Sequence, residues 1–99
     1  MAKNASVNPR HLRLPGERAA GADPVKLARQ LARFGPSIAG MPPVQVTRGA
    51  NGEMMIMDGV TRATRVAKML PGLLIRVLIT EELPNKDYSG LPTIGDTLP

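Results

Sequence analysis

The sequence predicts a single small domain of the α/β class, with an α+β arrangement in which a small mixed sheet carries two main helices. Three observations support this prediction. An amphipathic helix pattern fills residues 24–34, a hairpin signal joins the apolar runs of residues 43–57, and a second helix pattern separates that hairpin from a final apolar run at residues 73–79. With 99 residues, the chain has room for one modest core.

Composition narrows the classes of function. The chain has no Cys, which excludes a disulfide framework, a thiolate zinc site and cysteine chemistry, so we expect no redox cofactor. No apolar stretch reaches the length of a membrane span, and the N-terminus lacks a signal-peptide core. We therefore expect a cytoplasmic protein with no membrane partner, or alternatively a secreted effector domain. The net charge of +5 favours an anionic partner such as a nucleic acid or a nucleotide.

Residues 1–22 predict a flexible start with one short strand. Basic residues are spread here among Asn, Pro and Gly, and only Val7, Leu12 and Leu14 offer apolar anchors. His11 is the only histidine of the chain, so it has no histidine partner for a metal site.

The clearest amphipathic helix of the sequence is predicted at residues 23–34. Asp23 takes the N-cap position and Pro24 the first helical position, where its missing N–H costs nothing, and Gly35-Pro36 ends the helix. Its predicted buried stripe is Leu27, Leu31 and Phe34. Its outer face is Lys26, Arg29 and Arg33. This face is either a candidate contact for a nucleic-acid backbone or a solvated surface.

The next elements predict a hairpin. Residues 43–48 alternate as a half-buried strand, and the pair Asn51-Gly52 tolerates the positive φ that a tight turn needs. Residues 54–57, three of which are Met, return antiparallel. Their unbroken apolar character predicts burial on both faces.

A strand, a tight turn and a helix meet at residues 54–70. We expect Asp58 to cap the helix and Gly59 to allow a sharp bend. The predicted buried stripe is Ala63, Val66, Ala67 and Leu70, and the opposite side carries Thr61, Thr64, Arg65 and Lys68, with Arg62 at the flank. Hydroxyls and guanidiniums within one turn of a Gly predict an anion site. The phosphate-binding candidates are Gly59, Thr61, Arg62 and Arg65; the alternative is an ordinary capped helix with a basic face.

Residues 73–79 predict a second buried strand, followed by Thr80-Glu81-Glu82. A strand, a helix and a strand in this order predict a right-handed crossover between parallel strands. Asp58 would then lie on the same sheet edge as Glu81, where open α/β sheets bind ligands. Asp58 with Glu81, or with Glu82, is therefore the candidate catalytic pair for holding a divalent metal or activating water. The alternative is a helix cap and a solvated strand end.

Residues 83–99 predict a Pro- and Gly-rich strap after the core of residues 23–82. The strap has no periodicity and carries isolated Leu91, Ile94 and Leu98. We expect these side chains to dock on the domain itself, on a neighbouring domain or on a protein partner.

The chain resembles a known family at three places. These are Ser37-Ile38 with Gly40, the run Pro43-Val44-Gln45-Val46, and the turn Asp58-Gly59-Val60-Thr61-Arg62 before a hydrophobic final strand. Over roughly residues 6–80 they resemble the ParB-like domain shared by chromosome-partition ParB proteins, ParB-type nucleases and sulfiredoxin. The resemblance implies a ParB/sulfiredoxin-type fold and phosphate binding by Gly59, Thr61 and Arg62. It also implies Mg²⁺ as the cofactor of nucleotide binding.

Two departures from the family pattern bear on function. Partition ParB proteins bind a cytidine nucleotide with magnesium at a turn that usually reads Gly-Glu-Arg-Arg, whereas Val60 and Thr61 stand at the middle positions here. Sulfiredoxins carry their reactive Cys directly after the Gly, where this chain has Val60. Because this Cys is missing, the departure excludes reduction of a sulfinic acid.

Three hypotheses of function follow. The leading one is a nuclease-like module, such as a toxin domain of a bacterial effector, in which Arg62 and Arg65 hold a phosphate and the carboxylates bind metal or activate water. The second is a nucleotide- or DNA-binding switch or adaptor that uses the same arginines without turnover. The third is a protein-docking domain that has kept the fold and binds through its strap and its Met-rich strand. The sequence leaves open whether the protein is an enzyme.

Overall fold

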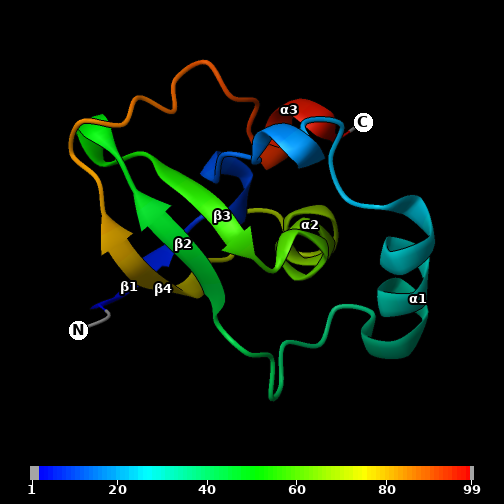
Figure 1. Cartoon of the computed structure of the whole chain (residues 1–99). Coiled ribbons are helices and arrows are strands. Elements are labelled where there is room, and N and C mark those ends of the chain that lie inside the picture. Colours follow the sequence, from blue (N-terminus) through cyan, green and yellow to red (C-terminus); the bar gives the residue numbers. More distant parts are fainter. Residues whose placement is uncertain (1–2, 99) are drawn as a thin grey trace.

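One mixed sheet organises the fold (Figure 1). The computed structural model describes residues 3–98, which form the strands β1 (Lys3–Val7), β2 (Val44–Arg48), β3 (Met54–Asp58) and β4 (Ile75–Glu82) in the order β1-β4-β2-β3. β2 and β4 are parallel, and the other two neighbouring pairs are antiparallel. The described residues also form the helices α1 (Pro24–Phe34), α2 (Val60–Met69) and α3 (Ile94–Thr97). The predicted small mixed sheet of an α+β domain is thus confirmed.

The predicted hairpin is also present. β2 and β3 pair antiparallel, with Val46 opposite Ile56, and a 3-10 turn at Ala50–Gly52 joins them. Asn51 and Gly52 both adopt positive φ, of 60° and 76°, as the turn signal predicted. β3 is an edge strand, however, and only Ile56 in it is buried, whereas Met57 is 57% exposed. The prediction of burial on both faces was therefore wrong for this strand.

The predicted parallel pairing across α2 was wrong. β4 pairs with β2 and not with β3, and β3 runs antiparallel to both. Pairing with β2 sets Val77 opposite Val44, and Ile79 opposite Val46, so the buried side chains of the two strands line up on one face. The parallel crossover therefore joins β2 to β4 and contains both β3 and α2.

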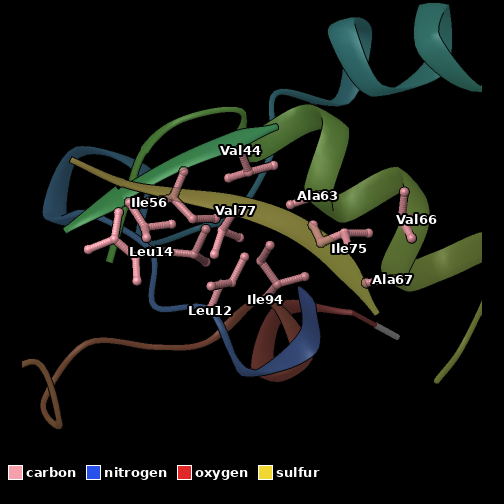
Figure 2. Close-up of a cluster of buried hydrophobic side chains, with 12 residues drawn as sticks. Leu12, Leu14, Val44, Ile56, Ala63, Val66, Ala67, Ile75, Val77 and Ile94 are labelled. Atoms are coloured by element: carbon pink, nitrogen blue, oxygen red, sulfur yellow. The ribbon is translucent and has the colours of Figure 1, made fainter. Parts of the chain in front are cut away.

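The core lies between one face of the sheet and a layer formed by α2, α3 and the segment after β1 (Figure 2). α2 contributes Ala63, Val66 and Ala67, and α3 contributes Ile94. The segment after β1 forms 3-10 turns at Pro9–His11 and Gly16–Arg18, and the residues between them place Leu12 and Leu14 in the core. This part of the chain, expected to be mostly flexible, thus supplies the fully buried side chains of Pro9, Leu12 and Leu14.

The C-terminal strap docks on its own domain. Tyr88 is buried against Gly49, and its hydroxyl lies 2.8 Å from the Thr47 hydroxyl on β2. Further along, Thr93 caps α3, and Ile94 enters the core. Of the docking sites considered for the strap, its own domain is therefore the one that the structure shows.

α1 lies at the periphery of the molecule, beside α2 (Figure 1). Its bounds match the prediction, since Asp23 caps it through the amides of Val25 and Lys26, and Gly35 ends it. Its predicted buried stripe is only partly covered: no residue of α1 is buried, and Phe34 is 41% exposed. The reason is that α1 packs mainly against one neighbour, outside the layer that covers the sheet. None of the helices within residues 3–98 combines the length and apolarity needed to cross a membrane.

Candidate functional site

The turn into α2 leaves the first amides of this helix without a side-chain cap. Gly59 is the N-cap residue, in the left-handed conformation with φ of 109°, and no side chain accepts a hydrogen bond from the first turn. Asp58 points elsewhere: its side chain is 65% exposed, and Oδ2 lies 3.4 Å from Arg62 Nη2. The prediction that Asp58 caps the helix was wrong, because a left-handed Gly59 stands between that carboxylate and the helix. Free N–H groups and the helix dipole thus favour an anion at this turn.

Arg62 folds back over Gly59. A Cβ atom on Gly59 would lie 2.9 Å from Arg62 Nη2 and 3.1 Å from Val44 Cγ2, so a side chain at this position would displace the Arg62 guanidinium. Nη2 also donates a hydrogen bond of 3.1 Å to the Pro43 carbonyl, which ties the start of α2 to the start of β2. This contact gives the Gly-x-x-Arg spacing a physical reason. The Nε donor of Arg62 is buried without a hydrogen-bond partner in residues 3–98.

A cavity of about 380 Å³ opens in front of this turn. One wall is the turn itself, with Gly59, Thr61 and Arg62, and the opposite wall comes from α1 and the preceding 3-10 turn. The charged residues of the cavity are the cations Arg18, Lys26 and Arg62 and the carboxylates Glu17, Asp23 and Asp58. Asp23 is already engaged as the cap of α1, and its two backbone hydrogen bonds lower its pKa below the ordinary 3.8.

A larger cavity, of about 680 Å³, lies elsewhere, between the end of β1 and the loop before β3. Its cation Arg13 is engaged, because it forms an ion pair with Glu53 and donates to the Leu91 carbonyl at 2.7 Å. The walls combine apolar side chains such as Val7 and Leu74 with isolated polar groups. Size alone would favour this cavity, but the smaller one holds the uncapped helix start.

Arg65 belongs to the scaffold and not to the cavity. It is 2% exposed, although the helical spacing had placed it on the outer face of α2 with the phosphate-binding candidates. Nη1 donates to the carbonyls of Gly35 and Ser37, at 2.7 Å each, and burial lowers the pKa of the guanidinium. Thr64 is likewise buried, and its hydroxyl donates to the Val60 carbonyl. The sequence could not predict this burial, because it depends on α1 lying against that face of α2.

The candidate catalytic carboxylates do not meet. Asp58 lies opposite Gln45 at the start of β2, whereas Glu81 lies opposite Thr47 and across β2 from Asp58. Because β3 and β4 run in opposite directions, their carboxyl ends lie at opposite ends of the sheet. Glu82 accepts hydrogen bonds from Arg48 and Lys3, which lower its pKa to about 2.

The part of the chain that the structure describes has no ready-made cluster of ligands for the Mg²⁺ that the resemblance implies. Within residues 3–98 no group of three or more His, Asp and Glu side chains could hold a metal ion. Asp58 is an exposed carboxylate at the cavity, so a Mg²⁺ ion there would depend on oxygen ligands from a bound phosphate group.

The basic face of α1 divides between the cavity and open surface. Lys26 lines the cavity, whereas Arg29 is exposed outside it, and Arg33 lies 5.2 Å from the centre of the Phe34 ring. Arg18 is a cavity residue that the sequence did not single out. It lies in a stretch without helix or strand periodicity, so no pattern indicated its position.

Comparisons with known proteins bear on the fold alone. A scan against protein families and a search of curated proteins both find no match to this chain. Among solved structures, the crystal structure of protein Atu1540 from Agrobacterium tumefaciens is similar, with a TM-score of 0.55 and 15% sequence identity. The similarity covers 85% of this chain and 42% of that chain, so this chain spans less than half the length of its structural neighbour.

Proposed function

We propose that this chain is a ParB-like phosphate-binding domain, which engages the phosphates of a nucleotide or a nucleic acid at residues 59–62. The observation that supports this most is the uncapped start of α2, which faces a cavity together with Arg62 and Lys26. Backbone amides, the Thr61 hydroxyl and guanidinium donors all favour phosphate oxygens. The Nε donor of Arg62 is buried and has no hydrogen-bond partner in residues 3–98, so a hydrogen bond to a bound phosphate would satisfy it.

Binding without turnover is the form of this proposal that the geometry favours. Hydrolysis of a phosphate ester needs a group that activates water, and the two candidate carboxylates lie on opposite sides of β2. The three carboxylates at the cavity offset its three cations, so a phosphate carrying Mg²⁺ suits the site better than a bare polyanion. The nuclease-like hypothesis would rest on Asp58 alone of the two candidate carboxylates, since Glu81 lies across β2 from the cavity.

The test is a binding titration with nucleoside triphosphates and a short DNA duplex, with and without Mg²⁺, on the wild type, Arg62→Ala and Arg29→Ala. A charge-assisted hydrogen bond contributes about 1.5–3 kcal/mol, so we expect Arg62→Ala to raise Kd roughly tenfold to a hundredfold. Arg29 is exposed outside the cavity and serves as the matched control, with an unchanged Kd for the triphosphates.

Arg62 also supports the fold through the Pro43 carbonyl, so circular dichroism must accompany the titration. Thr61→Val provides a second variant, which removes only a hydroxyl at the cavity and should weaken binding several-fold. Wild-type affinity in a folded Arg62→Ala protein, together with wild-type affinity in Thr61→Val, would contradict the proposal. So would the absence of binding to every phosphate compound tested.

A further inference from the structure

One guanidinium holds the C-terminal end of α1 on the body of the domain. Besides its two bonds to the carbonyls of Gly35 and Ser37, Arg65 donates through Nε to Gln30 Oε1 at 3.3 Å and through Nη2 to Met41 Sδ at 3.5 Å. Its charge also lies 5.2 Å from the centre of the Phe34 ring. All of these partners belong to α1 or to the segment that follows it.

The Arg65 charge is buried without a carboxylate partner. No Asp or Glu within residues 3–98 forms an ion pair with it, and its partners are carbonyl, amide, sulfur and ring groups. Carbonyls near the C-terminal end of a helix carry partial negative charge, so they stabilise the guanidinium in part. Water would stabilise it as well. Release of α1 would hydrate this buried charge, and this gain offsets part of the free energy that the Arg65 contacts contribute to docking.

The rest of α1 adds little to keep the helix in place. It contributes no buried side chain, and it is joined to the domain through Gly21 and Gly35, which both have positive φ. Segments with few buried apolar contacts open at low cost. These features allow α1 to move as a unit against α2.

The position of α1 also determines the shape of the phosphate cavity. Lys26 and Gln30 both come from α1 and line that cavity opposite the start of α2. Gln30 is at the same time a hydrogen-bond acceptor for Arg65, on the neighbouring turn of α2. The contact that fixes α1 thus lies directly beside the wall that faces the ligand.

We propose that Arg65 is a positioning residue for phosphate binding: by docking α1 it brings Lys26 to the cavity, and α1 acts as a hinged cover of the bound phosphate. This inference rests on the proposed function for its ligand. Arg65 itself does not contact the phosphate. Its role is to determine whether Lys26 can contact it.

The test combines a double-mutant cycle with amide hydrogen exchange, and it uses inorganic pyrophosphate as the probe. Lys26→Ala should weaken pyrophosphate binding about tenfold in the wild-type background, since it removes one charge-assisted contact. In the Arg65→Met background the same change should have almost no effect, because Lys26 is no longer held at the cavity. Met is similar in length and leaves no buried charge, and Arg65→Lys should restore part of the coupling.

Hydrogen exchange separates this inference from the proposed function. Without any ligand, Arg65→Met should speed amide exchange in residues 27–35 at least about tenfold, while exchange in β2 and β4 stays as in the wild type. Pyrophosphate should slow exchange of α1 in the wild type. Unchanged exchange in α1 of Arg65→Met would overturn the inference even if the protein binds pyrophosphate, and so would equal losses from Lys26→Ala in both backgrounds. If wild-type protein binds no phosphate, the proposed function fails, and the positioning role fails with it; the ligand-free exchange then decides only whether Arg65 holds α1.

Discussion

α1 and α2 share an amphipathic pattern of apolar and basic residues, yet they are buried to different extents. Both follow an acidic residue, both are about ten residues long, and both carry an apolar stripe beside basic side chains. α2 has buried residues on several sides, because the segment after β1, α3 and α1 all pack against it, whereas α1 packs mainly against α2. Amphipathicity therefore indicates which side of a helix can be buried. The number of neighbouring elements determines how many of its residues are buried.

The largest expected difference between the two helices is in core packing. Val66→Ala removes two methyl groups from a fully buried site on α2 and should lower the free energy of unfolding by about 2–3 kcal/mol. Leu31→Ala removes more carbon from a half-buried site on α1 and should cost less than about 1 kcal/mol. Urea denaturation of both variants measures the difference. Equal losses would mean that α1 is as much part of the core as α2.

A second difference concerns the glycines that border the helices. Gly59→Ala places a Cβ against Arg62 and Val44 at a left-handed position, and we expect a loss of about 2 kcal/mol. Gly35→Ala is also strained at a φ of 53°, but its Cβ would meet only the Leu31 carbonyl at 4.0 Å. Because α1 can shift to relieve this strain, the expected global loss is under about 1 kcal/mol. Thermal unfolding compares the two variants, and a larger loss for Gly35→Ala would reverse the comparison.

The smallest expected effect concerns the acidic residue before each helix. The cap bonds depress the pKa of Asp23 below 3.8, so the ionised carboxylate stabilises α1 at pH values above 3.8, and this contribution is lost as the pH falls through the lowered pKa. The protection factors of the α1 amides, taken relative to the intrinsic exchange rate at each pH, should therefore fall below pH 4, while those of the core strands change less. The measurement is amide exchange followed by NMR across this range.

Two matched variants test the assignment. Asn also accepts hydrogen bonds at an N-cap, so Asp23→Asn should preserve α1 and remove the part of the acid response that comes from this cap. Asp58→Asn should leave the amide protection of α2 close to that of the wild type, since Asp58 does not cap this helix. Loss of α2 protection in Asp58→Asn would show that the carboxylate does cap this helix in solution.

Local sequence signals predicted the elements well. Asp23-Pro24 and Gly35 gave the bounds of α1, and Asn51-Gly52 gave the hairpin turn, because caps and tight turns depend on residues within one or two peptide units. The sequence also singled out the turn before α2, where the Arg62 guanidinium lies against Gly59. Its role in binding phosphate remains a prediction.

Long-range contacts explain the errors. Arg65 was expected on an outer face, but α1 covers that face and turns the guanidinium into an internal contact. Asp58 and Glu81 were expected on one edge of the sheet, but they lie apart because β4 pairs with β2 and not with β3. The residues close to these positions do not determine either arrangement. Each depends on which apolar surface from a distant part of the chain packs there.

By itself, the sequence determined the bounds of α1 and the turn of the β2–β3 hairpin, through capping and turn conformation, which are local properties of the chain. Only the tertiary structure decided which arginine faces a cavity and which is buried, and which carboxylates lie together. The physical reason is that burial depends on the packing of elements far apart in sequence: the sheet order places α2 between the core and α1, and this single arrangement leaves Arg62 at the cavity and encloses Arg65.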